Sequence, residues 1–327
     1  MALVTELCAP AWESPLVRII RRSHTGDAQL SRKVPRDFGT FTTLGRMEAR
    51  TWRVGERELE CGPRTLVMGV LNVTPDSFSD GGLFLDHENA VAQGLRLAEE
   101  GADIVDVGGE STRPGSDEVS VEEEIERTTP VVKQLVAELD VPISIDTRKA
   151  EVARAALDAG AVIVNDVSGG RNPQMFDVVR ETGAGLVLMH MLGEPKTMQE
   201  DPRYEDVVGE VCEYLSVRLG AAVAAGIDRD RLAVDPGLGF GKSYHHNLEL
   251  MRAIEAFLIL GVPVLVGPSR KSFIGKALGD APLGERLEGT LAAVAWLADH
   301  GAHIVRVHDV KETLSLLKVI GAIRGAG

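Results

Sequence analysis

The chain has 327 residues, 44% of them hydrophobic, which is enough for one large core, and a single folded domain is the simplest expectation. Its formal net charge of −14 and pI near 5.1 make a nucleic acid or an anionic membrane an unfavourable partner. The cysteines Cys8, Cys61 and Cys212 are too widely spaced to indicate a disulfide framework or a zinc site. Since no apolar stretch is long enough for a membrane span, we expect a soluble, cytoplasmic protein that binds any anionic ligand through local basic groups.

The first 46 residues differ from the rest in charge, with seven Arg or Lys against four Asp or Glu. Their apolar residues follow no clear period, so we expect residues 1–46 to form a loosely ordered extension. Residues 47–327 are expected to form the folded domain, and Met47 is a candidate for the natural start of the protein. A β-hairpin is predicted at the beginning of this domain. Its strands would be Thr51–Val54 and Arg57–Cys61.

Strand and helix patterns alternate from Thr65 onward. Several strand patterns, at 142–146, 162–165, 185–189 and 263–266, are continuous apolar runs, which is typical of strands buried in a parallel sheet. Helical periodicity covers Glu88–Glu100, Val121–Leu139, Ala150–Ala159, Gln174–Thr182, Tyr204–Ala225, Asn247–Leu260, Glu285–His300 and Lys311–Ile323. Polar residues follow every strand pattern, whereas an open doubly wound sheet would concentrate them at one switch point. We therefore predict an α/β fold, a (β/α)8 TIM barrel whose strand ends converge on one mouth.

Polar loops follow the first two strand patterns. Asn72–Gly82 follows the apolar run Thr65–Leu71 and combines carboxamide, hydroxyl and carboxylate groups, which indicates the rim of an active site. Asp106–Ser116 combines glycines, hydroxyls and an arginine, a composition that can close over an anion. An ordinary polar turn is the alternative for this second loop.

Asp146 and Asn165 follow the next two strand patterns. In a barrel they would point into the mouth from neighbouring strands. A carboxylate beside a carboxamide suits a heterocycle that offers both hydrogen-bond donors and acceptors. The alternative for each is helix N-capping, for which Asp and Asn are favoured residues.

The segment Asp235–Ser243 ends in Gly-Lys-Ser and so invites comparison with a phosphate-binding P-loop. The spacing does not match, because Pro236 stands where that pattern requires glycine. We interpret its glycines as allowing the backbone to approach a flat ligand, with Asp235 supplying a carboxylate.

Basic residues follow the last two strand patterns. Ser269–Ser272 contains Arg270 and Lys271, and Arg306–His308 places two residues on one face of a strand. Loops after the seventh and eighth strands of barrels commonly bind phosphate, which suits these groups. The alternative is a structural pair between His308 and its neighbour Asp309.

These segments together resemble the dihydropteroate synthase family, which sulfonamides inhibit, over about residues 65–324. The matching segments, in the family's order, are MGVLNVTPDSFSDGG, DVGGESTRPGS, SIDTRK, NDVSGG, DPGLGFGK, SRKSFIG and RVHDV. The resemblance implies a barrel enzyme, a transferase that joins 4-aminobenzoate to (7,8-dihydropterin-6-yl)methyl diphosphate. The products would be 7,8-dihydropteroate and diphosphate, in tetrahydrofolate biosynthesis. It also implies a Mg2+ cofactor and a homodimer.

The resemblance assigns roles to individual residues. The pterin-binding residues would be Asp146, Asn165, Met189, Asp235, Gly267, Lys271 and Arg306. The diphosphate would contact Thr112, Arg306 and His308, the aminobenzoate would contact Phe78, Pro114 and Ser272, and Asn72 would bind magnesium. The catalytic residues would be Asp80, Arg113 and Lys271, with Asp80, or also Asp76, stabilising the cation left on the pterin methylene group when diphosphate departs. Loops that hold Phe78 and Arg113-Pro114 would close and exclude water.

Two alternatives remain open at this point. A pterin-binding methyltransferase of the methyltetrahydrofolate type would share the acid and amide contacts to the ring but would need no diphosphate site. A catalytically silent pterin-binding protein would have lost a matched polar residue, and none is lost here. The departures from the family pattern are Pro268, where a small residue is expected, and residues 1–46, which have no counterpart.

Overall fold

Eight parallel strands form the centre of the fold. The computed structural model describes residues 49–73, 82–111 and 118–325. The strands are hydrogen-bonded in the order β8-β7-β6-β5-β4-β3-β10-β9. They are β3 (Leu66–Asn72), β4 (Ile104–Gly108), β5 (Ile143–Asp146), β6 (Ile163–Asp166), β7 (Gly185–Met189), β8 (Leu232–Asp235), β9 (Leu265–Val266) and β10 (Ile304–Val307). An isolated parallel bridge between Val234 and Val264 joins β8 to the residue before β9, so the sheet closes on itself and the predicted barrel is confirmed.

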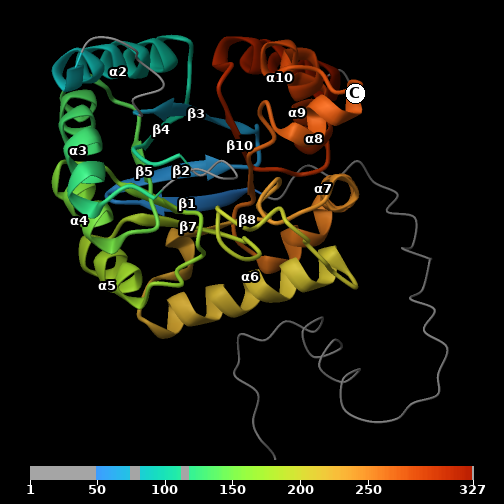
Figure 1. Ribbon diagram of the computed structural model, residues 1–327, viewed down its shortest axis with the longest axis horizontal. Helices are drawn as coiled ribbons and strands as arrows, with labels where there is room; N and C mark the ends of the chain where they lie inside the picture. Colours follow the sequence, from blue (N-terminus) through green and yellow to red (C-terminus); the bar gives the residue numbers. More distant parts are fainter. Residues whose placement is uncertain (1–48, 74–81, 112–117, 326–327) are drawn as a thin grey trace, which may run out of the picture. The chain divides into compact units, whose positions relative to one another are not determined.

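Helices follow the strands and surround them (Figure 1). They are α2 (Gly82–Glu99), α3 (Val121–Glu138), α4 (Ala150–Asp158), α5 (Pro173–Thr182), α6 (Val207–Ala224), α7 (Tyr244–Arg252), α8 (Ser272–Ala277), α9 (Leu287–Asp299) and α10 (Val310–Gly325). Short 3-10 segments are η2 (Arg229–Arg231), η3 (Ile254–Leu260) and η4 (Leu283–Glu285). The helices predicted at 121–139, 150–159 and 174–182 agree with α3, α4 and α5 to within one residue at each end.

Local sequence signals explain where two of these helices begin and end. The Ser120 side chain accepts a hydrogen bond from the backbone N–H of Glu123 at 3.2 Å and so caps α3, whose first turn is acidic as the helix dipole favours. In α5, Asn172 is the cap and Pro173 is the first helical residue, where its missing N–H is harmless. Gly183 ends α5 with a φ of 68°, a left-handed conformation that glycine adopts without strain.

Several helices differ from the prediction. The helix expected over Glu88–Glu100 already begins at Gly82 as α2. The helix expected over Asn247–Leu260 begins earlier, because Ser243 and His246 form a capping box, and it divides at Ala253 into α7 and η3. The helix α8 was not predicted at all. It has six residues, which is shorter than the window that helical periodicity needs.

The hairpin predicted near residue 50 is present as β1 (Arg50–Val54) and β2 (Arg57–Cys61), paired antiparallel. Its Trp52 side chain is fully buried, and its Nε1 donates a hydrogen bond to the backbone oxygen of Arg231 at 2.9 Å. Hairpin and strand side chains form one apolar cluster. Its members are Trp52, Val54, Cys61, Leu66, Met68, Ile104, Ile163, Val187, Ala233, Leu265 and Ile304. Because several of these residues lie near the beginnings of the barrel strands, the cluster, here called the floor, closes the N-terminal end of the barrel.

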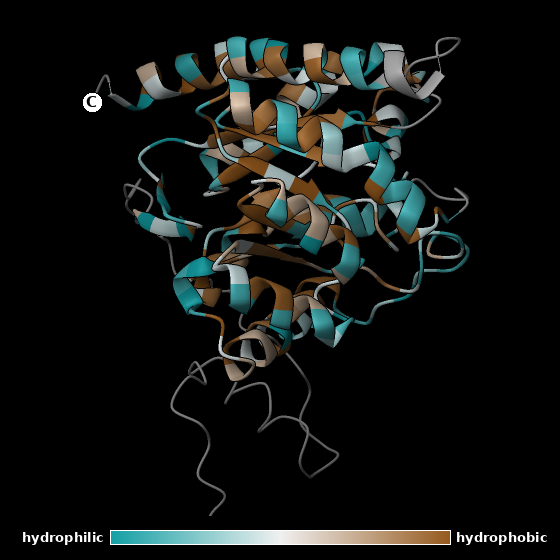
Figure 2. Cartoon of the chain, turned by 90° about the vertical axis from the view of Figure 1, so that its left-hand side faces the viewer, coloured by the Kyte–Doolittle hydropathy of each residue, from teal (hydrophilic) through white to brown (hydrophobic). Residues whose placement is uncertain are grey.

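A second apolar cluster lies between the strands and the helices. It pairs strand residues such as Val105 and Ile145 with helix residues such as Leu135 and Val152. Figure 2 shows the central strands mostly in hydrophobic colours, while the surrounding helices alternate between hydrophobic and hydrophilic residues along their length. Each helix therefore buries one face against the barrel.

Some expectations concern parts of the chain that the structure does not describe. Residues 1–46 lie outside the described residues, so the expected loosely ordered extension and the boundary at residue 47 stay predictions. Within the described residues, none of the helices combines the length and hydropathy needed to cross a membrane. Cys61 and Cys212 are both free thiols.

Candidate active site

The strand geometry explains how polar side chains reach the mouth of the barrel. Alternate residues of a strand face the same side, so each residue two positions beyond a floor residue also points into the barrel. The floor residue and the residue two positions later are Ile104 and Asp106, Ile163 and Asn165, Val187 and Met189, Ala233 and Asp235, Leu265 and Gly267, and Ile304 and Arg306. Most of the predicted pterin-binding residues are therefore brought together in one layer directly above the floor.

Arg306 is the centre of this layer. Its Nε donates a hydrogen bond to Asp106 Oδ2 at 2.6 Å, and one terminal nitrogen donates to Asp146 Oδ2 at 2.6 Å. The Nδ2 of Asn165 donates to the same oxygen of Asp106 at 3.0 Å. Because these residues come from four strands, the network connects β4, β5, β6 and β10 at the mouth.

Burial and neighbouring charges change the ionisation of this network. Burial raises the pKa of Asp146 to about 7, although the Arg306 guanidinium opposes the shift. For Arg306, burial alone would lower the pKa, but the Asp106 and Asp146 carboxylates raise it instead. The guanidinium is therefore a permanent cation, whereas the Asp146 carboxyl can change its charge near neutral pH.

Lys271 and Asp235 form the opposite side of the layer. The Lys271 ammonium donates a hydrogen bond to the backbone oxygen of Leu238 and lies 4.5 Å from the centre of the Phe240 ring. Burial lowers the pKa of Lys271 to about 8, and Asp235 opposes that shift. Burial also raises the pKa of Asp235, with Lys271 opposing, and its Oδ1 accepts a hydrogen bond from the Gly237 N–H at 2.7 Å.

Met189 and Gly267 line the same region. Met189 is 3% exposed and packs in a small apolar cluster with Met191 and Met198. A Cβ atom added to Gly267 would lie 3.7 Å from Arg306 Cβ and 4.0 Å from Lys271 Nζ, so this glycine borders both basic residues. The structure thus brings all seven predicted pterin-binding residues to one mouth.

The glycines after Asp235 have a different role from the one expected. A Cβ atom on Gly237 would lie 2.0 Å from the backbone oxygen of His190, and one on Gly241 would lie 2.5 Å from that of Leu192. Both glycines also have positive φ angles, 69° and 63°. At these two positions they make room for the neighbouring β7 loop, which corrects the expectation that they admit a flat ligand.

The helix-capping alternatives for Asp146 and Asn165 are wrong. Lys149 occupies the N-cap position of α4 without a capping side-chain bond, and the Asn172 side chain caps α5. Asp146 instead accepts from Arg306, and Asn165 donates to Asp106. Both side chains are therefore held in the mouth by long-range contacts.

The predicted phosphate-binding residues lie at the ends of β9 and β10. The Nδ1 of His308 is 2.9 Å from Ser269 Oγ, which also accepts a hydrogen bond from the His308 N–H at 3.2 Å. Arg270 Nε donates to Asp309 Oδ2 at 3.0 Å, so Asp309 pairs with Arg270, whereas the alternative drawn from the sequence paired it with His308. Ser272 is exposed at the first position of α8. The Arg270 guanidinium is therefore held by a protein carboxylate.

Several predicted residues fall outside the described residues. Phe78, Asp80 and the second candidate Asp76 lie in the segment 74–81, and Thr112, Arg113 and Pro114 lie in 112–117. Their roles stay predictions.

The sequence analysis missed Asp106 as a site residue. It is fully buried, and it accepts from both Asn165 and Arg306. A usable signal was its place as a carboxylate inside the apolar strand pattern Ile104–Gly108, since a charged residue in a buried strand requires a partner. The identity of the partner could not be predicted from the neighbouring sequence, because Arg306 is 200 residues away.

Asn72 is the candidate magnesium ligand, and its surroundings fit that role. It is the last residue of β3, half-buried at the mouth. Within the described ranges, no group of three or more His, Cys, Asp or Glu side chains could hold a metal ion. Mg2+ usually keeps several waters and is held by one or two protein oxygens together with substrate phosphates. A single carboxamide oxygen at the mouth, together with a substrate diphosphate, would match this kind of coordination.

Comparison with known proteins agrees with this geometry. The sequence matches the family of pterin binding enzymes over residues 68–308. It is 48% identical over 260 residues to the dihydropteroate synthase of Escherichia coli K12, covering 80% of this chain and 92% of that one. It is 50% identical over 268 residues to that of Mycobacterium leprae, covering 80% and 94%.

Solved structures show the same similarity. Dihydropteroate synthase from Xanthomonas albilineans with 4-aminobenzoic acid is 48% identical, with a TM-score of 0.79, and covers 84% of this chain and 98% of that chain. The Burkholderia cenocepacia enzyme complexed with 7,8-dihydropteroate is 42% identical, with a TM-score of 0.77, and covers 85% and 97%.

The barrel and its polar mouth, together with the sequence match, define a pterin-binding enzyme. Within that class the chain belongs to the dihydropteroate synthase family, whose members are transferases. These comparisons support that reading over a methyltetrahydrofolate-type methyltransferase.

Proposed function

We propose that this chain condenses 4-aminobenzoate with (7,8-dihydropterin-6-yl)methyl diphosphate to give 7,8-dihydropteroate and diphosphate, a step of tetrahydrofolate biosynthesis. The observation that carries the proposal is the buried network in which Arg306 bridges Asp106 and Asp146 at the mouth, opposite Asp235 and Lys271. Family members have been solved with 4-aminobenzoic acid and with 7,8-dihydropteroate, which agree with one reactant and the product.

The pterin ring carries amide and amine groups that need both acceptors and donors. Asp146 and Asp235 supply carboxylate acceptors, Asn165 supplies a carboxamide oxygen, and Lys271 supplies an ammonium donor. The Arg306 guanidinium is fixed by two carboxylates, so its planar face is available to stack on the ring. Met189 and Gly267 would complete the pocket by contacting the flat ring without polar competition.

The diphosphate would lie on the side of Arg306 that faces the ends of β9 and β10. Thr112, Arg306 and His308 would contact its oxygens, and Asn72 would hold a magnesium ion against it. When bound, Mg2+ would neutralise part of the diphosphate charge and make it a better leaving group. Ser272, Phe78 and Pro114 would contact the aminobenzoate.

In the reaction, the bond between the pterin methylene carbon and the diphosphate oxygen breaks, and the electron pair leaves with the diphosphate. The arylamine nitrogen then forms a bond to the same carbon and loses a proton. Asp80 would stabilise positive charge that develops on the pterin, while Arg113 and Lys271 would orient the reacting groups. The arylamine is itself a competent nucleophile and needs no strong base.

Assembly and location are also part of the proposal. A homodimer is supported by the family resemblance and by exposed apolar side chains on α10, where Val319 is 60% and Ile323 is 70% exposed. A cytoplasmic location is supported by the free thiols of Cys61 and Cys212, because a reducing compartment keeps thiols unpaired. Sedimentation equilibrium measures the oligomeric state.

The test is a coupled assay of diphosphate release, with and without 4-aminobenzoate and again after magnesium is removed with a chelator. We expect Lys271→Ala and Asp235→Asn to lower kcat/KM at least about 100-fold, because each change leaves a buried partner charge unpaired. Lys133→Ala, which changes an exposed lysine on α3, is the matched control and should leave activity unchanged. Near-normal turnover in both site variants would show that the assignment of the site is wrong, and release without 4-aminobenzoate would contradict the proposed acceptor.

A further inference from the structure

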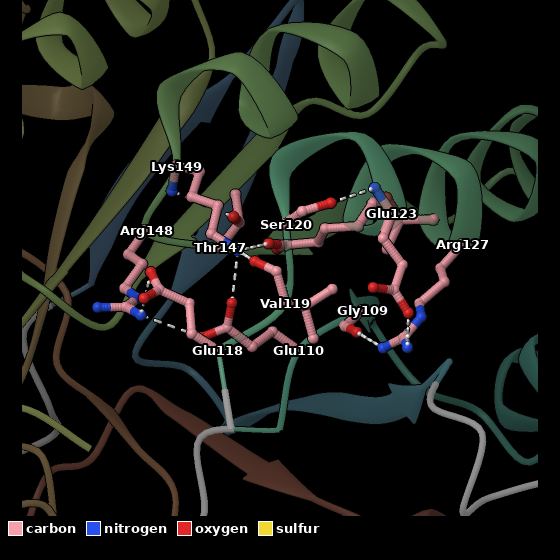
Figure 3. Close-up of polar contacts among 12 residues, drawn as sticks. Gly109, Glu110, Glu118, Val119, Ser120, Glu123, Arg127, Thr147, Arg148 and Lys149 are labelled. Carbon is pink, nitrogen blue, oxygen red and sulfur yellow. Dashed lines mark hydrogen bonds and ion pairs between the residues drawn. The ribbon is translucent and has the colours of Figure 1, made fainter. Parts of the chain in front are cut away.

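A second charged cluster lies behind Asp146, on the side away from Arg306. Lys149, which stands at the N-cap position of α4, contacts Glu110 Oε2 at 2.5 Å and Glu124 Oε2 at 2.7 Å, and it also donates to the backbone oxygen of Val119 (Figure 3). Arg148 lies 3.3 Å from the other oxygen of Glu110. The cluster therefore ties the end of β4 and the first turn of α3 to the segment that directly follows Asp146.

The cluster is largely buried. The side chain of Glu124 is 1% exposed, that of Glu110 is 8% exposed and that of Lys149 is 12% exposed. Burial alone would lower the pKa of Lys149, but Glu110 and Glu124 raise it, so the ammonium stays charged. The Lys149 ammonium thus contacts both buried carboxylates, and Arg148 contacts Glu110 as a second cation.

A small cavity connects this cluster to Asp146. Its lining consists of Glu110, Glu124, Asp146, Thr147, Arg148 and Val167, and it has room for about one water molecule. Three of the lining residues each carry a buried polar atom without a hydrogen-bond partner among the described residues. These atoms are Asp146 Oδ1, Glu124 Oε1 and Arg148 Nε.

We propose that Glu124, held by Lys149, is a positioning residue for Asp146, and that the two carboxylates and the Arg148 guanidinium share one water molecule in this cavity. The inference rests on the proposed role of Asp146 in pterin binding. A water has two donors and accepts from others, so it can donate one hydrogen to Asp146 Oδ1, donate the other to Glu124 Oε1 and accept from Arg148 Nε. The hydrogen-bonding capacity of all three atoms is then used, as buried polar atoms require.

This arrangement fixes both oxygens of the Asp146 carboxylate. Arg306 donates to Oδ2, and the proposed water would donate to Oδ1 from the cavity. A carboxylate held in this way presents its remaining lone pairs to the pterin in one orientation, which reduces the ordering required on binding.

The cluster also sets the charge that faces Asp146. The charged groups around its carboxylate are Arg306 on β10, Asp106 on β4, Glu124 on α3, Asp166 on β6, and Lys271 and Arg148 from the loops. Glu124 favours protonation of Asp146, and Lys149 offsets that effect by neutralising Glu124. Removing Glu124 or Lys149 should therefore move the ionisation of Asp146 in opposite directions.

The experiment measures binding of 7,8-dihydropteroate by calorimetry between pH 5.5 and 9. Pterin binding needs the ionised carboxylate, so affinity is lost as the pH falls through the pKa of Asp146. We expect Glu124→Gln to move the midpoint of this loss down by roughly half a unit to one unit, and Lys149→Met to move it up by a similar amount. Lys133→Met, an exposed lysine on α3, should leave the midpoint unchanged.

The outcomes separate this inference from the function on which it rests. Opposite shifts of the pH midpoint in the two variants support the positioning role of Glu124. If Lys149→Met does not fold, the shift in Glu124→Gln alone decides. Shifts in the same direction, or an unmoved midpoint in Glu124→Gln, would overturn it. Asp146→Asn is the reference variant. If it binds 7,8-dihydropteroate as tightly as the natural protein at every pH, Asp146 has no role in pterin binding, and this inference is wrong as well. Weak binding by Asp146→Asn with unmoved midpoints rejects the positioning role alone.

Discussion

The two ends of the barrel are built from the same strands but have opposite chemistry. At the floor, Ile104, Ile163 and Ile304 pack against the hairpin residue Trp52, and all four are fully buried. Two residues further along, the same strands carry Asp106, Asn165 and Arg306. Burial of apolar side chains stabilises the fold, whereas burial of charged side chains costs free energy that pairing only partly offsets. Inside the barrel, apolar packing therefore lies at one end and ligand chemistry at the other.

The largest effect on stability is expected from a substitution in the floor. Trp52→Ala removes a fully buried indole and its hydrogen bond to Arg231, so we expect a loss of about 3–5 kcal/mol in the free energy of unfolding. The measurement is urea unfolding followed by fluorescence and circular dichroism. Below the unfolding transition, KM should stay unchanged, because Trp52 packs in the floor and bonds to Arg231, away from the layer that carries Arg306 and Asp235.

Trp296→Ala is the matched control, since that tryptophan is 44% exposed on α9. It should cost clearly less stability than Trp52→Ala. Equal losses for the two variants, or a large change in KM for Trp52→Ala, would contradict the division between floor and mouth.

At the mouth, we expect kcat/KM to be high only over a narrow range of pH. Asp146 must be ionised to accept from the pterin, and burial raises its pKa to about 7. Lys271 must be protonated to donate, and burial lowers its pKa to about 8. The value of kcat/KM should therefore be greatest between these two pKa values and fall about tenfold per pH unit on either side.

The pH profile of kcat/KM should be measured with discontinuous diphosphate-release assays in buffers of constant ionic strength. Circular dichroism at each pH controls for unfolding. A flat profile from pH 6 to 9 would show that neither group controls pterin recognition in the free enzyme.

The smallest effect is expected on the outer surface. Arg64 pairs with Asp103, but its side chain is 59% exposed, so water and salt screen the interaction. We expect Arg64→Met to change the free energy of unfolding by less than about 1 kcal/mol and to leave activity unchanged. The same urea unfolding experiment measures it, and a loss as large as that of Trp52→Ala would show that surface pairs contribute as much as the floor.

Much of the fold could be predicted because its signals are local. The continuous apolar runs indicated buried parallel strands, and capping residues such as Ser120 and Asn172 accompany helix boundaries that the periodicity placed to within one residue. The helix α8 has no such signal, since six residues do not complete two turns of a pattern.

The site was predictable in part for the same reason. Asp146, Asn165 and Asp235 stand at strand ends, where barrel topology alone brings them together. The contacts between them are not local: Asn165 and Asp106 are 59 residues apart, and Lys149 and Glu110 are 39 residues apart. Sequence could therefore indicate which residues face the mouth, but not which of them hold one another in place.

The closure of the barrel is less uniform than the rest of its sheet. Between β8 and β9 the described backbone pairs through a single bridge, Val234 with Val264, and β9 itself has two residues. Asp235 lies at the end of one of these strands and Gly267 follows the other. In the proposed complex, one pterin ring would contact both strands at this junction between β8 and β9. The substrate would then act as a removable cross-link, so that occupancy of the site and the closure of the barrel reinforce each other.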